Sequence, residues 1–205
     1  MRLFCRLAFA AIPLLAQPAI AAADAAADAA TDAALAEMHA GADKYRDVEA
    51  ALADGYIRDP ADHCFTADMM GMPPEMGAMG VHYFRPDLLA VTSTDPVVDG
   101  AGTYTDWSQP SILIYEPQAD DSLELVAVEN LVFIKAWEAA GNGAPPVLLG
   151  RTWDTMIDDP ATEADEAHGF APHYDQHVWL YRENPAGVLE PFNAAVTCEH
   201  HHAAH

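Results

Sequence analysis

The eleven-residue run Leu123–Phe133 constrains the fold more than any other part of the chain. Its residues alternate between two faces, as in a β-strand, and each face is mostly apolar. Glu129 interrupts one of these faces. An isolated carboxylate in apolar surroundings is costly unless it is paired, protonated or bound to a metal. The run therefore predicts a strand with Glu129 as a candidate site residue, and an ion pair with an arginine such as Arg151 or Arg182 is the structural alternative.

The order of the predicted elements favours an α+β fold. From Asp32 to Asp54, apolar residues recur every three or four positions, which predicts one amphipathic helix. Its apolar stripe consists of Leu35, Met38, Tyr45, Val48 and Leu52. Further strands are predicted at Gly80–Phe84, Ser111–Glu116 and His173–Tyr181. We therefore expect the N-terminal helix to pack on a mainly antiparallel sheet, with long irregular loops over 95–110 and 141–172.

The N-terminus has the pattern of a signal peptide. Arg2 and Arg6 precede a short apolar run, and Ala19–Ala21 provides small residues for cleavage, so we predict a signal peptide over residues 1–21. The apolar run is too short to span a bilayer, and no membrane insertion is expected. A flexible Ala/Asp leader is predicted over 22–31, a single domain over 32–198 and a His-rich tail over 199–205. The expected location is periplasmic or secreted.

The composition restricts the partners. The chain has 32 acidic and 9 basic residues and a formal net charge of −23. Nucleic acids and anionic membranes require clustered Lys and Arg, so neither is an expected partner, whereas cations are attracted. The sequence contains none of the short patterns typical of serine hydrolases, nucleotide-binding proteins or zinc proteases. No nucleotide cofactor is therefore expected.

Two cysteines remain after the predicted cleavage removes Cys5. In an oxidising compartment Cys64 and Cys198 have one possible intramolecular pairing, which predicts a disulfide bond. A metal site that includes a cysteine is the alternative. Neither cysteine belongs to a C-x-x-C pair, which makes the disulfide the preferred interpretation.

Histidines in the strand-like runs are the main candidate metal ligands. His173 and His177 share a face of one predicted strand but lie about 13 Å apart, which is too far for one ion. We therefore favour His177, with His82 and Glu129 from other strands, and place His173 at the strand entrance. Asp175 is the nearest acidic residue on the same face. Two imidazoles and one carboxylate suit Zn²⁺, Fe²⁺ or Cu²⁺; histidines with purely structural contacts are the alternative.

Two other segments are secondary metal candidates. Thioether sulfurs favour Cu(I), and five methionines occur close together at Met69, Met70, Met72, Met76 and Met79. Methionines in such a loop also fill gaps in apolar packing. The tail carries His200, His201 and His202, which would bind Zn²⁺, Cu²⁺ or Ni²⁺ loosely.

Several phrases occur together, namely MGVHY at Met79–Tyr83, YEP at Tyr115–Pro117, VE at Val128–Glu129 and HYDQHVW at His173–Trp179. With them, the chain from about Lys44 to Cys198 resembles a family of small exported bacterial proteins that is known only as uncharacterised. The resemblance places the three favoured ligands and both later cysteines inside the family's phrases. Phe192–Ala194 departs from the W-N-P that is usual there. The resemblance implies no activity.

Three classes of function follow from these features. The first is an exported protein that binds copper or zinc through the His/Glu site. The second is an enzyme, metal-dependent or cofactor-free, in which Trp179, Tyr181 and Tyr83 line a pocket for a small molecule and Glu129 with His177 performs acid/base chemistry. The third is a structural or interaction domain without a site. The expected partner is a metal ion or a small molecule, and the sequence does not choose between an enzyme and a binding protein or set an oligomeric state.

Overall fold

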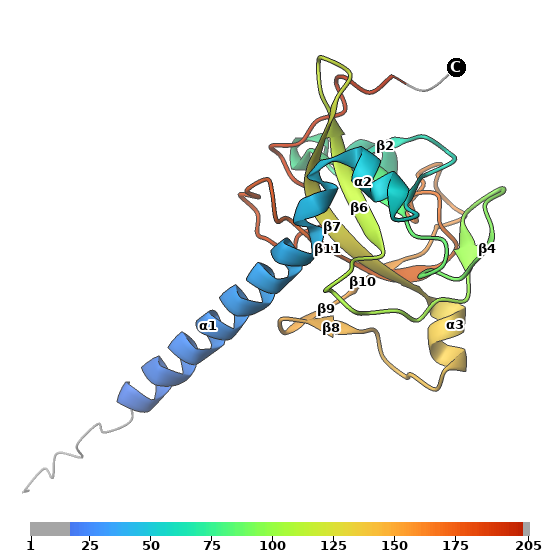
Figure 1. Ribbon diagram of the computed structural model, residues 1–205. Coiled ribbons are helices and arrows are strands. Elements are labelled where there is room, and N and C mark those ends of the chain that lie inside the picture. The colour runs from blue at the N-terminus through green and yellow to red at the C-terminus, as the bar shows by residue number, and fades with distance from the viewer. Residues whose placement is uncertain (1–16, 203–205) are drawn as a thin grey trace, which may run out of the picture. The chain divides into compact units, whose positions relative to one another are not determined.

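The computed structural model describes residues 17–202 (Figure 1). The basic and apolar regions of the predicted signal peptide, within residues 1–16, lie outside the described residues, as do residues 203–205 of the predicted tail. No helix in the described part of the chain is long and apolar enough to cross a membrane.

A seven-stranded antiparallel sheet forms the framework of the domain (Figure 1). Its strands follow the order β1-β3-β6-β7-β11-β10, and β2 also pairs with β3. They are β1 (Ile57–Arg58), β2 (Cys64–Thr66), β3 (Ala78–Phe84), β6 (Ile112–Pro117), β7 (Leu123–Phe133), β10 (Asp154–Met156) and β11 (His173–Val178). The predicted α+β class is confirmed, and each of the four predicted strands is present.

The differences from the predicted strands lie at their ends and in the loops. Strand β11 stops at Val178 because the Trp179 N–H donates to the carbonyl of Val188, 2.9 Å away, instead of to the sheet. The two loops predicted to be irregular contain short strands. These are β5 (Asp99–Gly100), which pairs with β4 (Val91–Ser93) just before the first loop, β8 (Val147–Leu148) with β9 (Arg151–Thr152), and β10. Runs of two or three residues carry too little periodicity to be recognised in a sequence.

The helices differ more from the prediction. They are α1 (Gln17–Ala42), the 3-10 turns η1 (Asp43–Arg46), η2 (Ala67–Met70) and η3 (Pro74–Met76), α2 (Val48–Ala53) and α3 (Ile134–Ala139). The single helix predicted from Asp32 to Asp54 begins earlier in the structure and is interrupted near Asp47, although the helical segment ends at Ala53. Helix α1 includes the Ala/Asp stretch 22–31, for which a flexible leader is predicted, because alanine has the highest helix propensity. The continuous helix ends before Asp47, whose extended backbone and side-chain bond to the Glu49 N–H begin α2.

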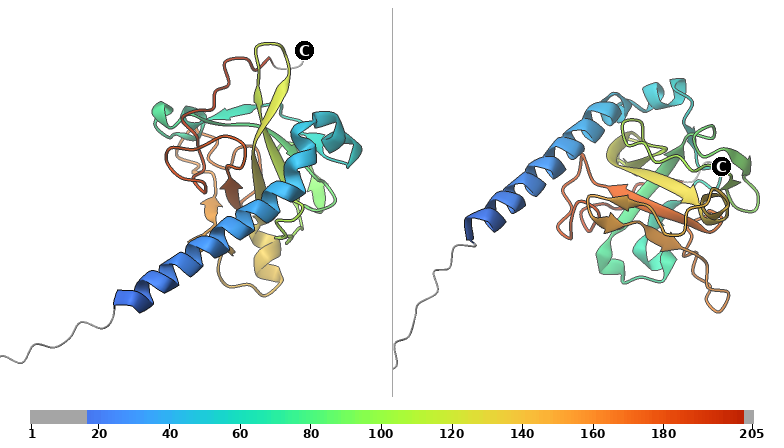
Figure 2. Two further views of the ribbon diagram at one scale, coloured as in Figure 1. Left: turned by 60° about the vertical axis from the view of Figure 1, so that its left-hand side comes forward. Right: turned by 90° about the horizontal axis from the view of Figure 1, so that it is seen from below.

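One face of the sheet packs against the segment that joins α1 to α2. Tyr45 is buried, its ring meets Tyr56 edge-on with centroids 4.9 Å apart, and its carbonyl accepts a hydrogen bond from the Tyr115 hydroxyl at 2.6 Å. Leu52 belongs to the same predicted stripe but is 43% exposed, because the break at Asp47 interrupts the helical period. In the right-hand view of Figure 2, α2 lies on one side of the sheet, and η2 and η3 lie on the other.

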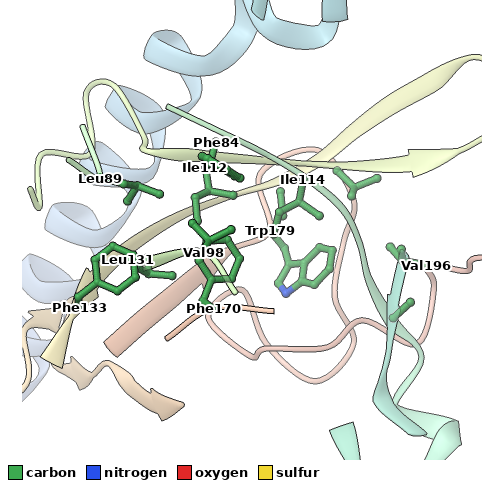
Figure 3. Close-up of a cluster of buried hydrophobic side chains, with 13 residues drawn as sticks. Phe84, Leu89, Val98, Ile112, Ile114, Leu131, Phe133, Phe170, Trp179 and Val196 are labelled. Carbon is green, nitrogen blue, oxygen red and sulfur yellow. The ribbon is translucent and has the colours of Figure 1, made fainter. Parts of the chain in front are cut away.

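The opposite, inner face of the sheet carries the main apolar core. Strand side chains from the inner face meet residues from the loops that cover it (Figure 3). The labelled members are Phe84, Leu89, Val98, Ile112, Ile114, Leu131, Phe133, Phe170, Trp179 and Val196. Because side chains alternate along a strand, His82 shares this face with Phe84, and Glu129 shares it with Leu131. The candidate site residues are thus buried in the core.

The predicted disulfide between Cys64 and Cys198 is confirmed. It joins the start of β2 to the C-terminal segment over a sequence separation of 134 residues. A disulfide of this kind is typical of a protein in an oxidising compartment.

Gly80 is a position in β3 where a side chain does not fit. Its φ is +121°, and an added Cβ would lie 2.6 Å from the carbonyl oxygen of Tyr115. We expect Gly80→Ala to lower the free energy of unfolding by more than about 1 kcal/mol, measured by urea denaturation. Gly143→Ala is the control, since an added Cβ there meets nothing within 4 Å. Equal stability of the two variants would contradict the expectation.

Candidate metal centre

Six ionisable side chains gather on the inner face of the sheet, and every one of them is 0% exposed. They are His82, Glu129, His168, His173, Asp175 and His177. The alternation of β11 places its two histidines and its aspartate on one face, as predicted. The strand register places Glu129 on β7 directly opposite His177. His82 comes from β3, and the residues that separate it from Glu129 belong to β6.

Glu129 lies between two imidazoles. Its Oε2 is 3.3 Å from Nε2 of His82 and 3.5 Å from Nε2 of His177. Glu129 therefore contacts both histidines that the sequence favours as ligands, but no group of ligand atoms within 4.8 Å of one another contains both His82 and His177. Neither arginine offered as a structural partner reaches Glu129. Arg151 pairs with other carboxylates, as does Arg182, so that interpretation is wrong.

Asp175 lies among the remaining imidazoles. Its Oδ2 is 3.7 Å from Nε2 of His168 and 3.7 Å from Nε2 of His173. Nδ1 of His177 is 4.0 Å from the same oxygen. His173 therefore belongs with Asp175. No group of ligand atoms within 4.8 Å of one another contains both His173 and His177, as expected for two histidines separated by four residues on a strand. Ligand atoms in three groups of three residues lie within 4.8 Å of one another: His82–Glu129–His168, His168–His173–Asp175 and Glu129–Asp175–His177.

His168 is the residue that sequence reasoning missed. It lies in the loop before β11, where no strand or helix period marks it. Its φ is +39°, a left-handed conformation that is uncommon outside glycine and often found at functional sites. Acidic side chains hold the loop on either side: Asp158 accepts from the Ala167 N–H at 2.9 Å, and Asp165 accepts from the Gly169 N–H at 3.0 Å. The only sequence signal is a histidine beside a glycine just before the His173 run.

The polar atoms of this centre are almost entirely without hydrogen-bond partners among the described residues. Only Nδ1 of His173 is bonded, to the carbonyl of Ala171 at 2.9 Å. A carbonyl can only accept, so Nδ1 of His173 carries a hydrogen, and Nε2 is the ring nitrogen that faces Asp175. Buried polar groups are normally bonded, and leaving one unpaired costs about 1–3 kcal/mol. Cation binding would satisfy such atoms.

Burial also sets the protonation of the centre. Desolvation raises the pKa of Glu129 to about 8 and lowers the pKa of His82 to about 4. Desolvation likewise lowers the pKa of His168 well below its usual value. At neutral pH Glu129 is therefore protonated, and these two imidazoles are neutral. Neutral imidazole is the form that binds metals, and a bound cation would displace the proton of Glu129.

Phenylalanines close the centre. The ring of Phe65 on β2 lies 5.3 Å from that of His82 and 5.5 Å from that of His168, and Phe170 lies 5.6 Å from both His168 and His173. The environment around the six side chains is therefore apolar.

The aromatic pocket predicted from Trp179, Tyr181 and Tyr83 is not formed. Trp179 belongs to the inner core, and its indole N–H donates to the Glu190 carbonyl at 2.6 Å. Tyr83 packs on Tyr115 at a centroid distance of 5.1 Å, and the Tyr181 hydroxyl donates to the carbonyl of His39 at 3.2 Å. Adjacent strand positions point to opposite faces, so Tyr83 cannot share a pocket with the inner-face Trp179.

An acidic cleft of about 360 Å³ lies beside His168. Asp59, His63 and Gly169 line it together with acidic residues of the 158–165 loop. Asp59 is only 3% exposed, its Oδ2 has no partner among the described residues, and burial raises its pKa. The N–H of Asp59 donates to the carbonyl of His82 at 2.9 Å. Asp59 thus connects the cleft with the buried centre.

The secondary metal candidates have other contacts. Met70 and Met79 are buried in a small apolar cluster with Phe65, and Met76 packs against it. Met69 and Met72 are 37% and 43% exposed. The described tail residues His200, His201 and His202 line a separate small pocket. There, Nε2 of His201 is 3.4 Å from Asp62 Oδ1.

Comparison of the chain with protein-family models, with curated proteins and with solved structures gives no significant match.

The metal-free protein is expected to be stabilised by Glu129→Gln at neutral pH. Burial raises the pKa of Glu129 from its ordinary value of 4.5 to about 8, so between these values the unfolded chain loses a proton that the folded chain keeps. Stability therefore falls as pH rises from about 4.5 to 8, and at pH 7 the loss is about 3 kcal/mol. The neutral amide removes this loss.

The measurement is urea unfolding with a chelator present at pH 4.5 and at pH 7. The free energy of unfolding of Glu129→Gln should exceed that of the unsubstituted protein by a large amount at pH 7 and by a small amount at pH 4.5. Glu138→Gln is the control, because Glu138 is exposed and its substitution should change little at either pH. A destabilised Glu129→Gln protein at pH 7 would contradict the assigned protonation.

Proposed function

We propose that this chain is an exported protein that binds a divalent transition metal, zinc or copper, in the buried His/carboxylate centre. The observation that carries the proposal is the set of six fully buried side chains whose ring nitrogens and carboxylate oxygens, with one exception, have no hydrogen-bond partner among the described residues. Burying such polar groups without hydrogen bonds costs free energy of folding if their role is purely structural, and their nitrogen and oxygen atoms are suited to bind a cation.

The donor atoms favour zinc or copper(II). Imidazole nitrogen and carboxylate oxygen are the ligands of Zn²⁺, Cu²⁺ and related ions, whereas Cu(I) prefers sulfur. Both later cysteines are consumed by the disulfide, and the buried methionines pack against Phe65 and Phe192. Cu²⁺ should bind more tightly than Zn²⁺, as the general order of affinities for divalent ions requires.

Charge and burial support a resident ion. The net charge of −23 and the acidic cleft beside His168 attract cations toward the centre. All six side chains are 0% exposed, which favours an ion that is held in the protein over a site that turns over a substrate. The disulfide supports export to an oxidising compartment.

Equilibrium dialysis followed by elemental analysis tests the proposal. The purified chain is freed of metal with a chelator, dialysed against Zn²⁺ or Cu²⁺, and compared with a tail variant carrying His200→Ala, His201→Ala and His202→Ala. We expect the tail variant to retain tightly bound metal. We expect Glu129→Gln to lose at least a tenfold factor in affinity, while His63→Ala, a change in the acidic cleft, retains binding. The proposal would be refuted if the tail variant bound no metal and Glu129→Gln bound as much metal as the unsubstituted chain.

A further inference from the structure

The six buried side chains divide into two equal sets around the two carboxylates. His82 and His177 have their Nε2 atoms 3.3 and 3.5 Å from Glu129 Oε2. His168 and His173 have their Nε2 atoms 3.7 Å from Asp175 Oδ2. Each set consists of two imidazoles and one carboxylate, which are donor types that zinc and copper take. The Asp175 set is a compact group with ligand atoms within 4.8 Å of one another, whereas in the Glu129 set the carboxylate lies between two imidazoles that share no such group.

On this basis we infer that the centre holds two metal ions, one in the Glu129 set and one in the Asp175 set. The inference rests on the proposed function and deepens it. A single ion does not account for the whole centre, because each compact group of ligand atoms contains only three of the six residues. An ion in either set alone would leave the other set's buried carboxylate and imidazoles unsatisfied.

The two sets adjoin each other. Glu129, Asp175 and His177 have ligand atoms within 4.8 Å of one another, and His177 offers Nε2 toward Glu129 and Nδ1 toward Asp175. Two-ion sites in proteins hold their ions about 3.5–4 Å apart, often with ligands shared between them. Glu129, His177 and Asp175 lie where the two sets meet, so ions in the two sets would be neighbours.

Two further carboxylates lie beside the sets. Asp59 is buried next to the Glu129 set, where its N–H is bonded to the His82 carbonyl. Asp154 on β10 stands directly opposite Asp175, but its charge is compensated by an ion pair with Arg151 at 3.2 Å. Glu129 and Asp175 together neutralise one divalent ion, so Asp59 is the additional carboxylate beside the centre for a second ion.

Stoichiometry tests the inference. Metal-free full-length protein with the tail substitutions His200→Ala, His201→Ala and His202→Ala is titrated with Zn²⁺, and bound zinc per chain is measured by elemental analysis after removal of free ion. We expect two zinc ions per chain. Asp175→Asn and Glu129→Gln, which keep the side-chain shape, should each bind one ion, and the double variant should bind none. Circular dichroism spectra confirm that each variant is folded.

The outcomes separate the inference from the proposed function. No zinc in the tail-substituted protein would overturn both. One zinc per chain would overturn the inference and leave the proposed function standing, as would the loss of all zinc with either single substitution in a protein that remains folded. Two ions that are lost one at a time support both.

Discussion

Saturation with Zn²⁺ is expected to raise the unfolding temperature of the metal-free protein by about 10 °C. A ligand at a thousand times its dissociation constant stabilises the folded state by about 4 kcal/mol, and each kcal/mol shifts the unfolding temperature of a domain of this size by about 2–4 °C. The reason is specific to the centre: the unfolded chain does not present the six buried side chains together. Differential scanning calorimetry at constant pH, with and without Zn²⁺, gives the shift.

The tail and the centre contribute separately to this experiment. The variant carrying His200→Ala, His201→Ala and His202→Ala should show the same shift as the wild-type chain, because the described tail residues lie in a pocket of their own. His177→Asn should reduce the shift, since His177 faces both carboxylates. A shift that vanishes with the tail histidines would place the metal at the chain end and not in the sheet.

Reduction of the Cys64–Cys198 disulfide is expected to lower the free energy of unfolding by about 5 kcal/mol, as the chain-entropy relation gives for a loop of this length. The corresponding drop in unfolding temperature is about 10–20 °C. Thermal unfolding is followed by circular dichroism with and without a reductant, in the presence of a chelator so that metal binding does not interfere.

The double variant Cys64→Ala, Cys198→Ala provides the control for this experiment. Its unfolding temperature should be low and should not respond to reductant. If the wild-type chain also failed to respond, the disulfide would contribute nothing to stability under these conditions. A response in the double variant would show that the reductant acts elsewhere.

The strands and one half of the centre could be predicted from the sequence because runs of apolar, strand-forming residues mark them. Leu123–Phe133 is apolar over most of both faces, so both the strand and the exceptional position of Glu129 are visible in it. The same reasoning places His177 on the inner face of β11. Convergence of His82 with these residues depends on the strand order β3-β6-β7-β11, which no local pattern specifies.

The rest of the structure depends on contacts and on single residues. One capping aspartate, Asp47, interrupts the helical segment and begins α2, although apolar residues continue the helical period on both sides of it. His168 is fixed by two aspartates and a left-handed backbone in a loop without periodicity. Helix α1 begins earlier than predicted for a different reason, since alanine favours helix even where there is no apolar stripe to bury.

Strand β2 has a consequence for how the buried histidines are covered. Cys64 and Phe65 are neighbours on this three-residue strand, so the covalent bond to Cys198 anchors the same backbone that presents Phe65 to His82 and His168. Before oxidation, this cover is held to the sheet by its short pairing with β3. Oxidation of the two thiols therefore fixes covalently the backbone that carries Phe65 over the buried histidines.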